Sequence, residues 1–264
     1  MGVKTTITLS ELNKIFTSYN FTKLLETTSG IIDTTYIAYT DENGYILKKY
    51  ERDISKNIET DIKLLRAMKY SGLNTPLCIE QNSGWYLYEK LQGSEPKNIK
   101  IYHIQAVARF LSKFHQHTHK QKCDLKMIDK DEIKSLLDYS KSNYFGYFKK
   151  LTPLMKYSSK EDGLIHGDIF KDNTVFENHK IGVFDFIDAA CGDFAFDAAV
   201  TLVGFDAKKK DSHINLFLNT YNQHAPRKIS KDELLLNIEL ASRFYALKRV
   251  KYQKSTKKAK ELLR

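Results

Sequence analysis

Hydrophobic and polar positions follow two different periods along the N-terminal third of the chain. Thr8 and Glu11 have the spacing of a capping box ahead of a short apolar stripe, which predicts the start of a helix. Residues 31–39 and 45–50 are rich in β-branched and aromatic side chains, and the turn sequence Asp-Glu-Asn-Gly fills positions 41–44. This combination predicts a β-hairpin.

A helix and a further strand are predicted after the hairpin. Apolar residues recur at helical spacing from 57 to 70, and Gly72 and Pro76 then stop the helical pattern. The stretch 85–91 has a strand pattern, which the sequence Gly-Ser-Glu-Pro at 93–96 interrupts. The order strand, strand, helix, strand predicts a small antiparallel sheet with one helix packed on it.

The pattern becomes mainly helical after position 96. An apolar stripe at helical spacing runs from Ile101 to His115. Further stretches of this kind lie at 132–139, 194–204, 214–221 and 231–252. We therefore predict an α+β chain with two lobes: a small sheet lobe over 1–91 and a larger, mainly helical lobe over 92–264.

Composition and charge narrow the class of protein. The 264 residues are 42% hydrophobic and 12% aromatic, which suits a folded chain with a sizeable core. The formal net charge is +10, but lysine is spread along the whole chain. Because no basic stretch interleaves with aromatic residues as in a nucleic-acid module, we do not expect a nucleic-acid partner.

The cysteines and the N-terminal segment bear on the compartment. Cys78, Cys123 and Cys191 lie far apart and form no CxxC pair, which predicts reduced thiols. Residues 1–10 lack the positive-then-apolar pattern of a secretion signal, and no run approaches the ~20 apolar residues of a membrane span. We expect a cytoplasmic protein without a membrane partner.

Two short segments, 165–173 and 183–186, contain the most informative polar residues. Asp168, Asn173 and Asp185 lie close in sequence, each at the edge of a short apolar run. Carboxylate and amide oxygens are the ligands that Mg²⁺ prefers, and a carboxylate can also accept a proton. The set fits a magnesium–nucleotide site that transfers a phosphoryl group.

The spacing of these residues indicates how they meet. Strand-like runs at 175–176 and 181–184 flank a turn sequence, so a hairpin is predicted there. Such a hairpin would bring Asn173 and Asp185 together as metal ligands, with Asp168 nearby. Taken singly, each of these side chains is more often a turn residue or a helix cap, but the set at this spacing is not.

The motif His-Gly-Asp at 166–168, with Asn173 and Asp185, closely resembles the catalytic segment of the aminoglycoside phosphotransferase and choline kinase group. These are small-molecule kinases with a two-lobe, protein-kinase-like fold. The resemblance implies that Asp168 positions or deprotonates the acceptor hydroxyl and that His166 braces the loop. It also implies ATP as co-substrate and Mg²⁺ held by Asn173 and Asp185.

The same fold implies a lysine that holds the nucleotide phosphates on the strand after the glycine turn. Lys48 and Lys49 point to opposite faces of this strand, and we choose Lys48 because it shares its face with Ile46. An acid on the following helix should pair with this lysine. Glu59 and Asp61 both fit, and the choice between them stays open.

Other contacts are implied elsewhere in the chain. Ser29 and Gly30 would form the turn that covers the phosphates, with one glycine where protein kinases have several. The adenine would lie against the backbone of a hinge from Glu89 to Leu91. Asp197 resembles an aspartate that opens a helix and caps its backbone donors, which is a structural role.

The acceptor is less constrained. Over nearly its whole length the chain is similar to bacterial homoserine kinases of the aminoglycoside-phosphotransferase type, through segments such as 165–173, 196–200 and 241–249. This resemblance implies phosphorylation of the hydroxyl of L-homoserine in threonine biosynthesis. Asp188, which that family does not typically carry, suits a cationic group on the acceptor. Arg243 is the candidate clamp for a carboxylate.

Other functions remain open. A kinase of the same fold acting on choline, ethanolamine, an aminosugar or an aminoglycoside is the nearest alternative, although the charge of +10 disfavours the acidic cleft of aminoglycoside kinases. A different class is a non-catalytic kinase-like or basic binding protein, which the basic residues from Lys248 to Arg264 favour. The intact chemical set, including Asp168 and Lys48, weighs against lost catalysis.

Overall fold

The computed structural model describes residues 3–27, 33–52, 54–157 and 160–264. Contacts between Cα atoms divide the chain into two compact units. The first unit contains Met1–Glu95, Val175–Asn178 and Gly182–Ile187, and the second contains Pro96–Thr174, His179–Ile181 and Asp188–Arg264. Among the described residues, no helix is long and apolar enough to cross a membrane.

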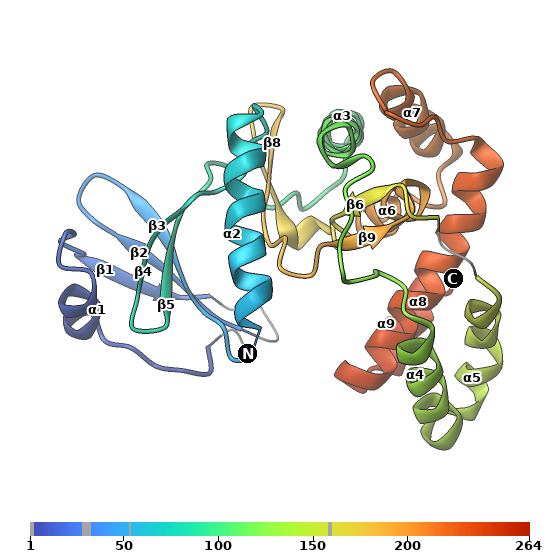
Figure 1. The fold of residues 1–264 in the computed structure, drawn as a ribbon, viewed down its shortest axis with the longest axis horizontal. Coiled ribbons are helices and arrows are strands. Elements are labelled where there is room, and N and C mark those ends of the chain that lie inside the picture. The colour runs from blue at the N-terminus through green and yellow to red at the C-terminus, as the bar shows by residue number, and fades with distance from the viewer. Residues whose placement is uncertain (1–2, 28–32, 53, 158–159) are drawn as a thin grey trace. The chain divides into compact units, whose positions relative to one another are not determined.

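The first unit contains a five-stranded antiparallel sheet (Figure 1). Its strands, in the order β1-β2-β3-β5-β4, are β1 Lys23–Glu26, β2 Thr34–Tyr39, β3 Gly44–Lys49, β5 Trp85–Glu89 and β4 Cys78–Asn82. The hairpin β2–β3 and the strand β5 confirm the sequence prediction. The edge strands β1 and β4 give no such signal, because most of their side chains are exposed and apolar and polar residues do not alternate in their sequences.

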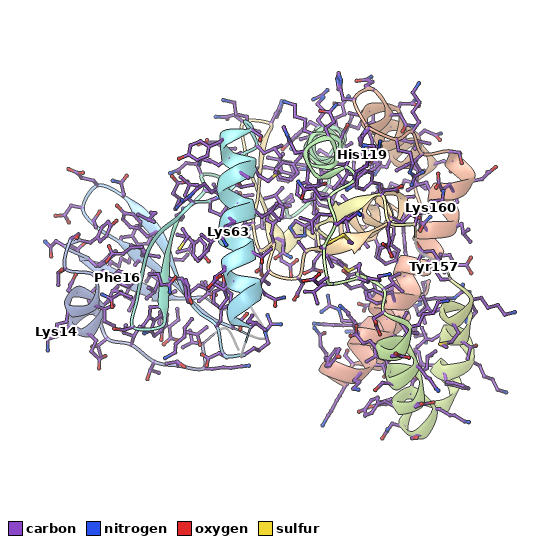
Figure 2. All side chains as sticks on the ribbon, viewed as in Figure 1. Lys14, Phe16, Lys63, His119, Tyr157 and Lys160 are labelled. Carbon is purple, nitrogen blue, oxygen red and sulfur yellow. A yellow bond between two sulfur atoms is a disulfide. The ribbon has the colours of Figure 1, made fainter. Side chains whose placement is uncertain are left out.

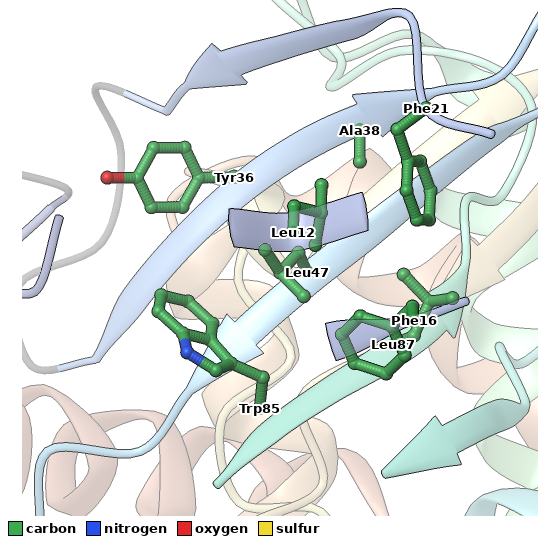
Figure 3. Packing of buried hydrophobic residues seen from close by; sticks show 8 residues of the cluster. All are labelled: Leu12, Phe16, Phe21, Tyr36, Ala38, Leu47, Trp85 and Leu87. Carbon is green, nitrogen blue, oxygen red and sulfur yellow. The ribbon is translucent and has the colours of Figure 1, made fainter. Parts of the chain in front are cut away.

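Two helices accompany this sheet, α1 Leu9–Ile15 and α2 Ser55–Tyr70. Thr8 Oγ1 accepts a hydrogen bond from the Glu11 amide, and the Glu11 carboxylate accepts one from the Thr8 amide, so the predicted capping box is confirmed. Figure 2 shows Phe16 directed from the end of α1 toward the sheet and Lys14 directed away from it. The core on this face is a cluster of Leu12, Phe16, Phe21, Tyr36, Ala38, Leu47, Trp85 and Leu87 (Figure 3).

The predicted second hairpin is present and contributes residues to both units. It consists of β7 Thr174–Glu177 and β8 Lys180–Val183. Within the first unit, the backbones of Ser94 and Phe176 exchange hydrogen bonds of 3.2 and 2.9 Å. Gly93 precedes this bridge with φ +106°, and a Cβ there would collide with the Phe176 carbonyl. Only glycine therefore allows the linker to lie against β7.

The second unit is mainly helical. Its α-helices are α3 Ile101–Thr118, α4 Lys130–Asn143, α5 Phe145–Leu151, α6 Phe194–Gly204, α7 Asp211–Asn222, α8 Lys231–Gln253 and α9 Thr256–Leu262. Every residue of α6 is buried, and this helix packs against α8. A small sheet pairs β6 Gly163–Ile165 with β9 Ala190–Gly192 (Figure 1). The sequence predicts α3, α4, α6, α7 and α8 but not the short helices α5 and α9.

The prediction of reduced thiols is wrong for two of the cysteines. Cys123 and Cys191 form a disulfide across 68 residues, with their Cα atoms 5.7 Å apart, whereas Cys78 is a free thiol. The pairing depends on β9: the Cys191 amide donates to Leu125 O, and Cys191 O accepts from the Met127 amide, both at 2.9 Å. These contacts are tertiary, so the spacing of the cysteines in the sequence could not reveal them.

Candidate active site

An ion pair joins Lys48 and Asp185 in the first unit. The Lys48 Nζ lies 2.7 Å from Asp185 Oδ1. The Nζ of Lys49 lies on the α1 side of the sheet instead, 5.3 Å from the centroid of the Trp85 ring. Strand alternation thus directs Lys48 to the face opposite the α1 core, where it meets a carboxylate.

Asp61 is the helix acid that acts on this pair. Asp61 on α2 is only 3% exposed, whereas Glu59 is exposed. Burial alone would lower the pKa of Lys48, but the charges of Asp185, Asp61 and Asp33 outweigh it and raise this pKa above its ordinary value. The structure therefore favours Asp61 over Glu59, a choice that the sequence leaves open.

Two tyrosines line the same site, and sequence reasoning missed them. The hydroxyls of Tyr50 and Tyr88 lie 3.0 Å apart, and the Lys48 Nζ lies 5.0 Å from the centroid of the Tyr50 ring. Burial, then the neighbouring Tyr88 and the charge of Asp61, raise the pKa of Tyr50 far above its ordinary value. Both phenols therefore stay neutral. The sequence held a signal for them, because side chains two residues apart on a strand share a face: Tyr50 follows Lys48 by two residues, and Tyr88 lies on β5 two residues after Tyr86.

The backbone of Asp185 is in an uncommon conformation. Asp185 follows β8 with φ +67°, the left-handed region that few residues other than glycine adopt. Such conformations persist where the surroundings hold them, and they gather at functional sites. Here the outlier is the residue whose carboxylate meets Lys48.

The structure describes the residues predicted to contact the adenine but not those predicted to cover the phosphates. Ser29 and Gly30 lie outside the described residues. The Glu89 carboxylate accepts hydrogen bonds from Lys69 Nζ at 2.7 Å and from the Leu77 amide at 3.2 Å, and the Glu89 amide donates to Leu77 O at 2.9 Å. The Leu91 side chain lies against Gly182 of β8. Glu89 is thus held at the end of β5, and Leu91 packs on the second hairpin.

In the second unit, Asn173 orients the Asp168 carboxylate. Asn173 ends the 3₁₀-helix η2 Lys171–Asn173, and its Nδ2 donates to Asp168 Oδ2 at 3.0 Å and to Asp168 O at 2.8 Å. The Asp168 amide donates to His166 Nδ1 at 3.2 Å. Because the Asn173 amide nitrogen is directed at Asp168, its oxygen is directed elsewhere and has the chemistry of a hard-cation ligand.

Asp197 holds the loop that carries Asp168. Its carboxylate accepts hydrogen bonds from the amides of His166 and Gly167, at 2.9 and 2.8 Å, and from His115 Nε2 at 3.0 Å. The predicted capping role is therefore corrected: Asp193 caps α6 through the Ala195 amide, whereas Asp197 binds the backbone of a distant loop. The structural character expected for Asp197 comes from bracing this loop.

The protonation states of this network follow from its burial. His115 and Asp197 have 0% side-chain exposure. Burial lowers the pKa of His115, so the ring is neutral; its Nδ1 accepts from the Tyr221 hydroxyl at 2.7 Å. Burial alone would raise the pKa of Asp197, but the hydrogen bonds that it accepts from His115 and the Gly167 amide lower it. Neutral His115 thus donates to ionised Asp197.

Gly167 allows close packing on both sides of the loop. Gly167 has φ +73°, and a Cβ there would collide with the side chain of Met127. Its carbonyl accepts a hydrogen bond from the hydroxyl of Tyr245 on α8. Tyr245, which the sequence did not single out, therefore fixes the peptide directly before Asp168.

A family model described as "Phosphotransferase enzyme family" matches residues 23–229. The chain belongs to this family. The homoserine kinase of Bartonella henselae is 27% identical over 229 residues, which cover 76% of this chain and 72% of that protein.

Solved structures of other phosphotransferases have the same fold. The choline kinase from Streptococcus pneumoniae matches with TM-score 0.73 at 16% identity, over 95% of this chain and 94% of that one. An amicoumacin kinase, solved with AMP-PNP and Ca²⁺, matches with TM-score 0.70 at 15% identity, over 97% and 89%. These likenesses confirm the predicted kinase-like α+β fold.

The two predicted acceptor residues of this phosphotransferase have different surroundings. Arg243 on α8 donates from Nε to Lys150 O at 3.0 Å and pairs with Glu239 at 2.5 Å. It lies two positions from Tyr245, so the two side chains leave the helix on different faces. Burial raises the pKa of Tyr245, whose hydroxyl donates to the Gly167 carbonyl beside Asp168, and the charge of Asp188 contributes to this rise. The structure does not bring Arg243 to the Asp168 loop.

Residues for a divalent cation are hard oxygen donors in both units. The described residues contain no group of three or more His, Cys, Asp or Glu side chains placed to hold a metal ion. The Asn173 amide oxygen and the Asp185 carboxylate nevertheless have the chemistry that Mg²⁺ selects, and nucleotide phosphates supply the remaining ligands in kinases. Each of these two residues, taken within its own unit, therefore carries an oxygen donor that suits magnesium.

Proposed function

We propose that this phosphotransferase moves the γ-phosphoryl group of ATP to the hydroxyl of L-homoserine, giving O-phospho-L-homoserine and ADP for threonine biosynthesis. The observation that carries the proposal is the Asp168 carboxylate, which Asn173 orients and the Asp197 network braces. The similarity to a homoserine kinase at 27% identity supports the choice of acceptor. A cytoplasmic location stays a prediction.

In this proposal Asp168 accepts a hydrogen bond from the acceptor hydroxyl and takes its proton as the new P–O bond forms. The hydroxyl oxygen attacks the γ-phosphorus, and the bond to the β-phosphate oxygen breaks to release ADP. Asn173 fixes one Asp168 oxygen, so little reorganisation is needed when the hydroxyl arrives. His166 braces the loop by accepting from the Asp168 amide.

Lys48 is assigned to the nucleotide phosphates. Its raised pKa keeps the ammonium charged, and its partial exposure leaves it open to an anion that competes with Asp185. Asn173 and Asp185 are assigned to Mg²⁺, which when bound neutralises phosphate charge. An amicoumacin kinase of the same fold was solved with AMP-PNP and Ca²⁺, which supports a divalent cation and ATP. Ser29, Gly30, Glu89 and Leu91 stay predicted nucleotide contacts.

A panel of acceptors tests this function. ADP release is measured with L-homoserine, choline and an aminoglycoside, each with and without Mg²⁺. We expect turnover only with Mg²⁺, and the largest kcat/KM with L-homoserine. A larger kcat/KM with choline would favour the second candidate, a choline or ethanolamine kinase, which the anionic Asp188 and the similarity to a choline kinase support.

The substitution Asp168→Asn tests the role of the carboxylate. We expect kcat to fall by about 10²- to 10⁴-fold, the usual contribution of a positioned general base, while the affinity for ATP stays near that of the wild type. The matched control is Asp172→Asn, an exposed acid in η2, which should leave kcat unchanged. Near-wild-type turnover of the Asp168 variant would reject this mechanism. Salt-dependent polynucleotide binding without any turnover would favour the basic binding protein.

A further inference from the structure

One face of α8 is directed at the catalytic loop. The Tyr245 hydroxyl donates to the Gly167 carbonyl, and the Tyr245 ring lies 4.9 Å from the ring of Phe170, centroid to centroid. Gly167 and Phe170 lie on either side of Asp168 in the sequence. The side of α8 that carries Tyr245 is therefore the side beside the Asp168 loop.

Arg249 lies on this same side of α8. It follows Tyr245 by four residues, and side chains at this spacing are neighbours on one helix face. The Nζ of its neighbour Lys248 lies 4.7 Å from the centroid of the Phe244 ring and 5.9 Å from that of the Tyr245 ring. The face beside the catalytic loop therefore carries a guanidinium one turn beyond Tyr245.

The charges around Tyr245 agree with this placement. Burial raises the pKa of Tyr245 well above its ordinary value, and the carboxylates of Asp168, Asp197 and Asp188 raise it further. Arg249 acts in the opposite direction on the same phenol. The charges of Asp168, Asp188 and Arg249 thus all act on Tyr245, within the second unit.

Arg249 has the features of an anion site. Its side chain is half-buried, and within the described part of the chain its guanidinium has no hydrogen bond or ion pair. Arg243 differs, because it is bound to Lys150 O and to Glu239. A half-buried guanidinium without a carboxylate partner favours an anion from a ligand, and its planar donors match a carboxylate.

We propose that the second unit recognises a zwitterionic hydroxy-amino acid, in which Arg249 binds the α-carboxylate and Asp188 binds the α-ammonium while the hydroxyl meets Asp168. This inference rests on the proposed kinase activity and assigns the groups that select its acceptor. It replaces Arg243 by Arg249 as the carboxylate clamp. Choline, ethanolamine and aminoglycosides carry cationic groups but no carboxylate, so they lack the group that Arg249 would bind.

The test compares L-homoserine with 3-aminopropan-1-ol, which is homoserine without its carboxylate. In Arg249→Gln, we expect KM for L-homoserine to rise about 10- to 100-fold, because a charge-assisted pair is lost, while KM for the amino alcohol stays unchanged. Arg249→Lys should restore part of the difference. Arg243→Gln is the matched control and should change neither KM, because Arg243 is bound to Lys150 O and Glu239.

A second variant separates the two charged groups. Asp188→Asn should raise KM for both acceptors, because both carry an ammonium. Thermal unfolding of each variant verifies folding, and Asp188→Asn keeps the proposal testable where Arg249→Gln fails to fold. Equal effects of Arg249→Gln on both acceptors, or no effect on L-homoserine, would overturn the assignment while leaving the kinase intact. Absence of turnover by the wild type with any acceptor would overturn the proposed function itself, and this assignment with it.

Discussion

Each of the two units contains a hydrogen-bonded pair of side chains near the proposed chemistry, and these pairs differ in what surrounds them. His115–Asp197 in the second unit has 0% side-chain exposure on both sides, whereas the side chains of Lys48 and Asp185 in the first unit are 15% and 34% exposed. The Asp197 carboxylate also accepts two backbone amides of the catalytic loop. Both carboxylate oxygens of Asp197 accept hydrogen bonds from protein donors, so this side chain fixes the position of the loop. The Asp185 carboxylate is partly open to solvent, so it can exchange Lys48 for a ligand.

The difference is also one of energy. Removing one partner of a buried pair leaves polar groups without hydrogen bonds in a place that water does not reach. Removing one partner of a partly exposed pair lets water or ions take its place. The buried pair should therefore matter for folding, and the partly exposed pair for function.

The largest expected effect is on the free energy of unfolding, when the buried His115–Asp197 pair is broken. Asp197→Ala removes the acceptor of two loop amides and of His115, and we expect the free energy of unfolding to fall by about 3–5 kcal/mol. Urea denaturation measures it. The control Asp172→Ala, at an exposed acid, should change it by less than about 0.5 kcal/mol. Equal stability of the two variants would show that the network does not hold the loop.

Local patterns predict the parts of this molecule that depend on neighbours in sequence. The capping box of α1, the hairpin β2–β3 and the opposite faces of Lys48 and Lys49 follow from spacing alone. The edge strand β1 does not, because its pairing with β2 supplies the order that its exposed side chains do not encode.

Contacts between distant residues account for what the sequence could not give. His115 and Asp197 are separated by 82 residues, and Tyr245 and Gly167 by 78, so no local period connects them. The sequence marks Asp197 only as an acid near the start of a helix, and its true partners are visible only in the fold. Asp168 and Asn173 are five residues apart, and this local pair is the part of the site that the motif does predict.

A smaller effect on stability is expected when the partly exposed Lys48–Asp185 pair is broken. Lys48→Met breaks the pair with Asp185, and we expect the free energy of unfolding to change by no more than about 1 kcal/mol, the usual range for exposed pairs. Turnover should fall by about 10²-fold or more, because a phosphate-binding charge is lost. Urea denaturation and ADP release measure the two effects.

Lys49→Met is the matched control for this variant, since Lys49 lies on the other face of β3, over the Trp85 ring. It should leave turnover unchanged. If the two lysine variants lost turnover equally, the assignment of Lys48 to the phosphates would not stand. A loss of stability in Lys48→Met as large as that in Asp197→Ala would remove the contrast between the two pairs.

The finest distinction is in the response to pH. The pKa of His115 is lowered in the folded state, so below about 6.5 the unfolded chain binds more protons, and the stability that neutral His115 contributes is lost as the pH falls through its folded pKa. The pKa of Lys48 is raised, so its contribution is complete below about 10.5 and is lost as the pH rises through its folded pKa. Urea denaturation at a series of pH values should therefore show an acid decline that His115→Gln flattens and an alkaline decline that Lys48→Met flattens. An acid decline that His115→Gln leaves unchanged would contradict the role assigned to the buried pair.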